Sequence, residues 1–481
     1  MNKLFNDIAN SDFATILLFR LKRLWKILME AINGNSEDFT AISLKRAIFL
    51  LSVPMILEMA MESVFAVVDI FFVSKLGSEA VAVVGITETI TTVVYAIGAG
   101  LNVAATAVIS RRIGEKNSKA ANNASFQAIL TVLIPGISIG IAGILFSEDI
   151  LMLMGIERSM VNSFSSYTTI ILGSNIVIMI IFVINAIFRS VGDAALAMKV
   201  LLIANIFNLI LDPLLIFGWG PVPCLGIKGA AIATTIGRAM AVLIQFYLLF
   251  RGNGRIKLIK KDLKLDYKVI LSILRLSVGT IGQNLIATAS WIALMRILAE
   301  FGSSVLAGYT IALRLIIFAL LPSLGFGNAA STLVGQNLGA KSPARAEKAV
   351  WAIGKQSMLF LSTIGLCFII FPEFWIKIFI QEQEVVKIGA RGLQIISLGY
   401  ASYGLGIVLV HSINGAGDTF TPTFLNIVSF WLFEIPMALL LAYVFGLREN
   451  GVFISIVLAE TFMTLSALWV FHRGNWKTRQ V

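Results

Sequence analysis

Three carboxylates stand out because they lie inside an apolar stretch, residues 47–74, which contains Glu58, Glu62 and Asp69. A stretch of this length can cross a bilayer as a helix. At about 100° per residue, Glu62 and Asp69 fall within roughly 40° of Glu58, so all three share one stripe. Carboxylates that face lipid would be very costly, so we expect this stripe to face a helix bundle or a watered cavity. Functional carboxylates and paired structural carboxylates both fit this pattern.

A second polar group lies beside Pro213. Asn208 and Asp212 are four residues apart and therefore project from one helical face. Pro213 removes one backbone hydrogen bond, and a kink there would free a carbonyl oxygen. Carboxylate and amide oxygens of this kind suit a hard monovalent cation such as Na⁺. Close, desolvated carboxylates could equally share a proton, and Asn208 and Asp212 could instead only satisfy the helix break.

The composition is that of a membrane protein. Of the 481 residues, 58% are hydrophobic and only 14% are charged, whereas soluble domains are about 25% charged. Two cysteines and two histidines supply neither a disulfide framework nor a histidine-rich metal site. The sequence has no Gly-x-x-x-x-Gly-Lys-Ser/Thr phosphate loop and no soluble domain that could hydrolyse ATP. We therefore expect a protein that is not an enzyme, holds no cofactor and uses an ion gradient.

Twelve apolar segments are long enough to span a bilayer. They cover residues 47–74, 80–104, 125–146, 162–187, 196–217, 229–250, 270–299, 305–330, 350–371, 392–413, 424–446 and 451–471. The predicted fold class is thus an all-α polytopic membrane protein. An extension, residues 1–46, precedes the spans. Its leucines recur at helical spacing among basic residues, which predicts an amphipathic helix on the cytoplasmic lipid surface, with a disordered segment as the alternative.

The basic residues predict the orientation of the chain. Loops after even-numbered spans, together with both termini, hold 26 Lys and Arg, whereas loops after odd-numbered spans hold 7. Such an excess places both termini in the cytoplasm, in a multi-pass protein of the cell membrane. It also accounts for the net charge of +11 without a nucleic acid partner.

The two halves of the chain repeat each other. At an offset of 225 residues, Leu51-Ser52-Val53 falls on Leu276-Ser277-Val278, and Gly192-Asp193 falls on Gly417-Asp418. Each half has six spans, an even number, so a pseudo-two-fold axis along the membrane normal should relate them, with substrate handled between them. We name these halves the N-lobe (47–250) and the C-lobe (270–472). A basic linker (251–269) joins them, and a cytoplasmic tail (473–481) follows.

Four stretches carry a resemblance to a known family. They are Val68 to Gly77; Leu209 to Pro213 with Gly229 to Thr234; Leu333 to Gly339; and Gly417-Asp418-Thr419 with Pro422. In these motifs, and over residues 42–472, the chain resembles the multidrug and toxic compound extrusion (MATE) transporters. The pattern is most similar to the DinF-like and archaeal branch. The resemblance implies two six-helix lobes that alternate between inward- and outward-open V shapes.

The resemblance also implies an activity and a site. Family members export cationic or amphipathic compounds by antiport against inward-flowing H⁺ or Na⁺, and we expect a monomer. In the DinF-like branch the coupling cation is held inside the N-lobe. The matching positions here are Asp69, Asn185, Asn208, Asp212 and Thr234, of which Asp69, Asn208 and Asp212 could hold Na⁺. Glu62 stands where that branch often has Gln.

The C-lobe departs from the NorM-like branch of the same family. The Glu and Asp that this branch uses in its seventh and tenth segments align with Ala287 and Tyr403. At the repeat offset the mate of Asp69 is Leu294, an apolar residue. Glu434, at offset 222 from Asp212, would be a single carboxylate without partners, which makes a poor ion site. We therefore predict that ion coupling resides in the N-lobe and that Glu434 contacts a cationic substrate.

Other intramembrane charges keep more than one interpretation. Glu88 and Arg314 lie within one residue of being repeat mates, and Arg238 maps onto Glu460 at offset 222. Contacts that stabilise or gate the lobes are as compatible with these positions as contacts with substrate. Two rival functions also remain, a lipid-linked oligosaccharide flippase of the same superfamily and a channel or receptor. A flippase should have further spans or a strongly cationic cavity, and a channel should have a continuous polar pore.

Overall fold

The structure is a computed structural model that describes residues 22, 25–34, 37–219, 222–251, 256–258 and 264–480. Helices dominate these residues, and an isolated bridge joins Trp219 to Val222. The N-lobe comprises α2 (Leu44–Val73), η1 (Ser74–Leu76), α3 (Ser78–Gly114), α4 (Ser118–Leu153), α5 (Arg158–Gly173), α6 (Asn175–Val191), α7 (Ala194–Phe217) and α8 (Ile227–Arg251).

The C-lobe follows the same plan with more interruptions. Its elements are α9 (Tyr267–Ala299), α10 (Ser303–Gly339), α11 (Pro343–Ile370), α12 (Pro372–Lys377), α13 (Gln383–Ser397), α14 (Tyr400–Gly415), α15 (Phe420–Asn426), η3 (Ile427–Glu434), α16 (Ile435–Leu439), η4 (Leu440–Val444) and α17 (Arg448–Arg473). The segments η3 and η4 are π-helical. A short helix, η5 (Asn475–Thr478), lies in the tail.

The helices agree with the predicted spans. Ten of those described are long and apolar enough to cross a membrane, and the pair α13 and α14, bent by 56°, makes an eleventh if it crosses as one span. The remaining predicted span is α2, whose 30 residues include the three carboxylates. The prediction of an all-α, multi-pass membrane protein is confirmed, and its two-lobe, twelve-span plan is consistent with the structure.

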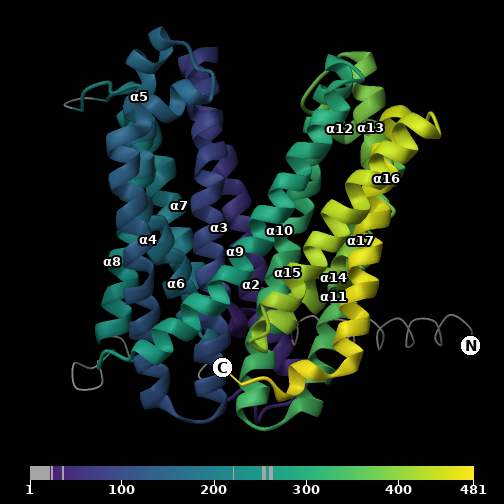
Figure 1. Ribbon diagram of the computed structural model, residues 1–481. Coiled ribbons are helices and arrows are strands. Elements are labelled where there is room, and N and C mark those ends of the chain that lie inside the picture. The colour runs from purple at the N-terminus through teal and green to yellow at the C-terminus, as the bar shows by residue number, and fades with distance from the viewer. Residues whose placement is uncertain are drawn as a thin grey trace, which may run out of the picture.

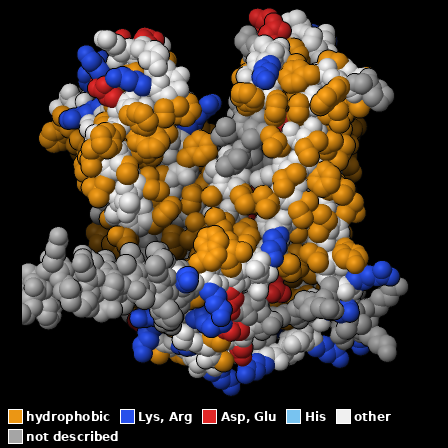
Figure 2. All heavy atoms as spheres, turned by 180° about the vertical axis from the view of Figure 1, so that it is seen from behind, with side chains coloured by type: hydrophobic (Ala, Val, Ile, Leu, Met, Phe, Trp, Pro, Cys, Tyr) orange, Lys and Arg blue, Asp and Glu red, His pale blue; other side chains and the backbone are white. Residues whose placement is uncertain are grey.

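Two groups of helices form a V. Figure 1 shows that α3–α8 and α10–α17 converge at the end where the C-terminus lies and diverge toward the end that holds α5, α12 and α13. Seen in space-filling form in Figure 2, the molecule is hollowed between the two groups at the divergent end. Apolar side chains cover its flanks, as a lipid-facing surface requires, and many of the Lys and Arg gather at the convergent end. We call these the open end and the closed end.

The lobes meet through two matched helix crossings, α3 on α9 and α2 on α10. A Cβ on Gly100 would lie 2.4 Å from a side-chain carbon of Ile281, and a Cβ on Gly325 would lie 2.7 Å from the backbone of Ile56. Gly100 and Gly325 are repeat mates, as are Ile56 and Ile281, so each crossing reproduces the other. Small residues allow such close approach of helix backbones in membranes.

The closed end contains a third crossing, between the last turns of α3 and α10. A Cβ on Gly114 would lie 1.9 Å from the Gln336 carbonyl oxygen, and a Cβ on Gly339 would lie 2.2 Å from the Arg111 carbonyl oxygen. These four residues are again two pairs of repeat mates. The pseudo-two-fold axis inferred from the sequence therefore passes between Gly114 and Gly339, where the backbones of the two lobes touch.

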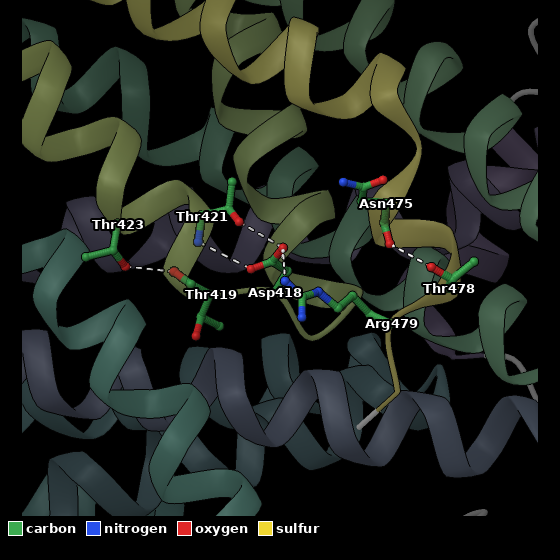
Figure 3. A network of polar contacts seen from close by, with 7 residues as sticks. All are labelled: Asp418, Thr419, Thr421, Thr423, Asn475, Thr478 and Arg479. Carbon is green, nitrogen blue, oxygen red and sulfur yellow. Dashed lines mark hydrogen bonds and ion pairs between the residues drawn. The ribbon is translucent and has the colours of Figure 1, made fainter.

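The tail lies across the closed end. Trp476 is buried, stacks on Phe471 with ring centroids 4.7 Å apart and donates its indole N–H to the Phe471 carbonyl at 2.9 Å. Further on, the Arg479 guanidinium pairs with the Asp418 carboxylate at 3.2 Å, as Figure 3 shows. The Arg111 guanidinium of the N-lobe donates to the Arg479 carbonyl. The tail thus contacts both lobes.

The segment before α2 also joins the lobes at this end. Phe39 is buried against Gly192 of the N-lobe. The Arg345 guanidinium of the C-lobe donates to the carbonyl of Phe39 at 3.0 Å and to that of Ile42. Residues 25–33 are helical, but most of the predicted amphipathic helix lies outside the described residues.

Candidate cation-coupling site

Three helices bring four predicted coupling residues together in the N-lobe. Asp69 lies near the end of α2, Asn208 and Asp212 occupy one face of α7, and Thr234 lies on α8. All four are buried, and Asp212 has no exposed surface. The spacing of four residues on α7 works as expected, because the Asn208 side-chain amide donates to the Asp212 carboxylate at 3.0 Å. We call these four residues the N-lobe site.

A chain of hydrogen bonds connects the N-lobe site. The Thr234 hydroxyl donates to the Asp69 carboxylate at 3.4 Å, and the Asn208 amide reaches the Thr234 hydroxyl oxygen at the same distance. Both distances are long for hydrogen bonds of these types. The two carboxylates are therefore linked through one amide and one hydroxyl, in a loose arrangement with space for small adjustments.

Two buried oxygen atoms in this site, Oδ2 of Asp212 and Oδ1 of Asn208, have no hydrogen-bond partner among the residues that the structure describes. A buried acceptor without a donor costs about 1–3 kcal/mol, and more when it carries charge. A proton on Asp212 or a bound cation would each satisfy these atoms. Oxygen donors of this kind suit Na⁺ as well as H⁺ chemistry, so the residues present fit either coupling ion.

Arg238 on α8 supplies positive charge beside the N-lobe site. Its guanidinium donates to the Tyr95 hydroxyl at 2.8 Å and interacts electrostatically with Glu62 and Asp69. The stripe on α2 therefore faces a polar interior, as its three carboxylates predict. The sequence identified Arg238 as an intramembrane charge, but nothing in its spacing linked it to Asp69.

Glu58 belongs to a different cluster. Its Oε1 accepts hydrogen bonds from Arg189 at 3.0 Å and from Asn185 at 2.9 Å, and its side chain is only 1% exposed. The other end of the Asn185 amide accepts from Gln245 at 2.7 Å. Asn185 was expected beside Asp69, but both ends of its amide are engaged here. The paired structural role, one of the two interpretations of Glu58, fits these contacts.

Arg189 is buried, whereas the sequence predicts a solvated loop residue. Its guanidinium was counted among the cytoplasmic loop charges, yet Arg189 lies in α6 and is 2% exposed. An arginine so close to a Gly-Asp loop looks solvated in the sequence. Only the tertiary structure reveals its partner, Glu58 of α2. Removing one residue from 26 leaves the charge asymmetry between loops intact.

Glu88 and Arg314 lie on opposite lobes. Both side chains are exposed, Glu88 on α3 and Arg314 on α10, and they interact electrostatically. Glu88 also interacts with Asp69 and Arg238, so it links the N-lobe site to the surface of that lobe. The electrostatic interaction between the lobes and the exposure of both side chains keep both interpretations of this pair, gating and substrate contact.

Glu434 is not the isolated carboxylate that the sequence predicted. It is buried at the end of η3 and interacts with the Ser290 hydroxyl and with a second carboxylate, Glu460 of α17. Tyr403, which aligns with an Asp of the NorM-like branch, makes a side-chain hydrogen bond with Glu460. The repeat did not predict this pair, because the N-lobe residue that maps onto Glu460 at offset 222 is the cation Arg238.

The described residues contain no cluster of side chains typical of a protein metal site. Among them, no group of three or more His, Cys, Asp or Glu side chains could hold a metal ion. The polar groups described above are buried carboxylates with amide, hydroxyl and guanidinium neighbours, in a two-lobed membrane protein.

Comparison with known proteins identifies the family. A family model described as MatE matches residues 54–214 and again residues 280–440, so the repeat appears as two copies of one module. The chain therefore belongs to the MATE family, whose members are transporters and not enzymes. The predicted family is confirmed, while its DinF-like branch stays a prediction.

Individual relatives cover nearly the whole chain. It is 25% identical to a probable multidrug resistance protein NorM of Thermotoga maritima, over 91% of this chain and 94% of that protein. It is also 25% identical to an FAD transporter of Shewanella oneidensis, over 89% and 94%. A crystal structure of MATE in complex with MaL6 has the same fold, with a TM-score of 0.86, 24% identity and coverage of 92% and 99%.

Proposed function

We propose that this protein is an antiporter that exports cationic or amphipathic compounds, driven by H⁺ or Na⁺ entering through the N-lobe site. It works as a monomer in the cell membrane, with both termini in the cytoplasm. With that orientation, the open end of the V faces outward. The names of relatives as multidrug resistance proteins support export of drugs.

One observation carries the coupling proposal, the unpartnered oxygens of Asp212 and Asn208 inside the N-lobe site. A buried site that lacks donors for its own acceptors is incomplete without a proton or a cation. A small ion that enters from the outside would complete it. Loss of that ion toward the cytoplasm would leave the acceptors unsatisfied again and favour a return to the other state of the lobes.

The helices that carry the N-lobe site can transmit ion binding to the interface between the lobes. Asp69 is on α2, which packs on α10 of the C-lobe, and Asp212 is on α7, which packs on α2. A cation held between α2, α7 and α8 would draw these helices together. Because α2 also crosses α10 of the C-lobe, such a shift would be transmitted to the interface between the lobes.

A second substrate class has a specific observation in its favour. A relative covering most of this chain is an FAD transporter, and FAD is an anionic dinucleotide. Arg314 is an exposed cation on α10 that would suit a phosphate group. Export of FAD is therefore the second candidate, and the same preparation should be assayed with it.

The test uses purified protein in proteoliposomes with an imposed pH gradient, an imposed Na⁺ gradient, or both. We expect a fluorescent organic cation to move against one of these gradients in the wild type. Asp212→Asn and Asp69→Asn should lose this gradient dependence and retain a folded, monodisperse chain, because each exchange nearly preserves volume. Glu384→Gln, an exposed carboxylate far from the N-lobe site, is the matched control.

Two results would refute the proposal. Gradient-driven transport at the wild-type rate in both Asp variants would remove the N-lobe site from coupling. Transport that depends on neither H⁺ nor Na⁺ in the wild type would remove antiport itself. Transport of FAD without the organic cation would favour the second candidate.

A further inference from the structure

The C-lobe contains a polar group that the N-lobe site does not explain. Glu434 ends the π-helical segment η3, and Pro436 follows in α16. π-helical turns are rare and frequently occur at functional sites. Pro436 has no N–H, so the backbone there lacks one hydrogen bond, as it does at Pro213 beside Asp212. Both lobes thus place a buried carboxylate next to a proline within a spanning segment.

Glu434 is buried as completely as the residues of the N-lobe site. Its side chain is 1% exposed, and within the described part of the chain its Oε2 has no hydrogen-bond partner. The segment η3 packs on α17, where Phe433 stacks on Phe462 with ring centroids 4.8 Å apart. This packing brings Glu434 to Glu460, and the two carboxylates interact. Glu434 therefore presents an unpaired acceptor oxygen to a neighbourhood that already contains a second carboxylate.

The groups that face this pair are neutral. Tyr403 of α14 interacts with both carboxylates, and Tyr309 of α10 interacts with Glu434. Beyond these, α9 contributes the Ser290 hydroxyl, and η3, α15 and α16 contain no further charged residue. The charged residues of α9 and α17 other than Glu460 lie toward the ends of those helices. Among the interactions found for this pair, none comes from Lys or Arg.

The two lobes differ in the charge at one repeat position. In the N-lobe Arg238 offsets the charge of Glu62 and Asp69, but its repeat mate in the C-lobe is Glu460, which adds a negative charge. Two ionised carboxylates without a cation in an apolar bundle would be very costly. The least costly composition of such a pair contains a proton, as in carboxylate dyads elsewhere.

Ser290 is the polar neighbour that α9 contributes to this pair. Its hydroxyl donates to the Ala287 carbonyl at 2.9 Å and also forms a side-chain hydrogen bond with Glu434. Because a hydroxyl has a single hydrogen to share between two acceptors, Ser290 cannot replace a positive charge beside the two carboxylates.

We propose that Glu434, Glu460 and Tyr403 form a second, separate proton-binding site in the C-lobe, in which the two carboxylates share one exchangeable proton. Glu460 is less buried than Glu434 and is the member through which the proton exchanges. Tyr403 positions Glu460 through its hydroxyl. A role of this site in transport rests on the proposed function, but proton binding itself does not. The earlier expectation of ion chemistry in the N-lobe alone would then be incomplete.

Infrared difference spectroscopy of the full chain in lipid, recorded between acidic and alkaline buffer, tests this without transport. A protonated carboxyl group has a carbonyl band that its ionised form lacks. We expect the Glu434→Gln/Glu460→Gln double variant to lose one component of the wild-type band. Tyr403→Phe should shift that component, because one hydrogen bond to the pair is lost. Asp69→Asn, Asp212→Asn and the exposed-site control Glu373→Gln should leave it unchanged.

A double variant with the wild-type spectrum would overturn the proposal. So would loss of the component when Na⁺ is added at constant pH, because the site would then take a metal ion. If the double variant does not fold, a hydrophobic carbodiimide, which reacts with protonated buried carboxyl groups, is applied to the wild type. No adduct at Glu434 or Glu460 would also overturn it. A normal band with no driven transport would refute the proposed function instead.

Discussion

The ion pair between Glu58 and Arg189 has an uncharged counterpart in the other lobe. In the N-lobe, the Arg189 guanidinium donates to Glu58 at 3.0 Å, and both side chains are buried. Their repeat mates at offset 225 are Gln283 and Asn414, which exchange two amide hydrogen bonds of 3.1 and 3.0 Å. The same two positions therefore connect the first span of each lobe to its fourth, by an ion pair in the N-lobe and by amide hydrogen bonds in the C-lobe. This equivalence argues that Glu58 is structural.

Exchanging one pair for the other tests this role. Glu58→Gln and Arg189→Asn should each destabilise the protein by roughly 3–5 kcal/mol, because each leaves a buried charge without its partner. The double variant Glu58→Gln/Arg189→Asn recreates the C-lobe pair and should recover most of that loss. Thermal unfolding in detergent measures the four members of this double-mutant cycle, with the exposed Glu373→Gln as a neutral control. Additive losses in the double variant would contradict a paired role.

The glycine crossing at the closed end should control the balance between the two states of the lobes. Gly114→Ala places a methyl group 1.9 Å from the Gln336 carbonyl, so the backbones must separate. Overpacking of this kind costs about 1–3 kcal/mol, which would change the population ratio roughly 5- to 150-fold. Spin labels at the repeat mates Lys119 and Ala344 should report longer distances in Gly114→Ala and in Gly339→Ala. Gly85→Ala, which meets nothing within 4 Å, should match the wild type.

The tail should be anchored more strongly by Trp476 than by its ion pair. Arg479 is 54% exposed, so its pairing with Asp418 contributes at most about 1 kcal/mol. Burial of Trp476 is larger, and truncation of such a side chain costs about 3–5 kcal/mol. Hydrogen exchange of residues 474–480 should therefore rise strongly in Trp476→Ala and only slightly in Arg479→Ala. Thr478→Ala is the control, and the reverse ranking would refute this anchor.

The orientation of the chain can be checked with two single cysteines. The loop charges predict Lys75 outside and Lys341 in the cytoplasm, and both side chains are exposed. Cys224 and Cys367 are exposed and are first replaced by serine. A membrane-impermeant maleimide added to intact cells should then label Lys75→Cys and spare Lys341→Cys until the cells are opened. Labelling in the opposite order would invert the predicted topology.

Much of the architecture could be read from local sequence. Long apolar segments must form helices in a bilayer, because every backbone polar group has to be satisfied within the segment. The offset of 225 residues predicted the module that the family model matches twice. It also paired Gly114 with Gly339 and Ile56 with Ile281, which the structure places at matched contacts between the lobes.

Within the site, the residues on a single helix were the easiest to group. Asn208 and Asp212 share a face of α7 because helical geometry fixes that relation, and they are hydrogen-bonded. The meeting of Asp69 with Thr234 was implied only by the family resemblance. The assignment of Asn185 by the same route placed it with Asp69, whereas it contacts Glu58 and Gln245.

The sequence by itself determined which segments cross the membrane, that they form two copies of one module, and which charges lie within them. It could not determine which buried charge meets which, because partners such as Glu58 and Arg189 are 131 residues apart and join through helix packing. Only the tertiary structure separated Glu58 from Asp69 on their common stripe and brought Glu460 to Glu434. The physical reason is that helical periodicity gives the direction of a side chain, while the neighbouring helix decides what it meets there.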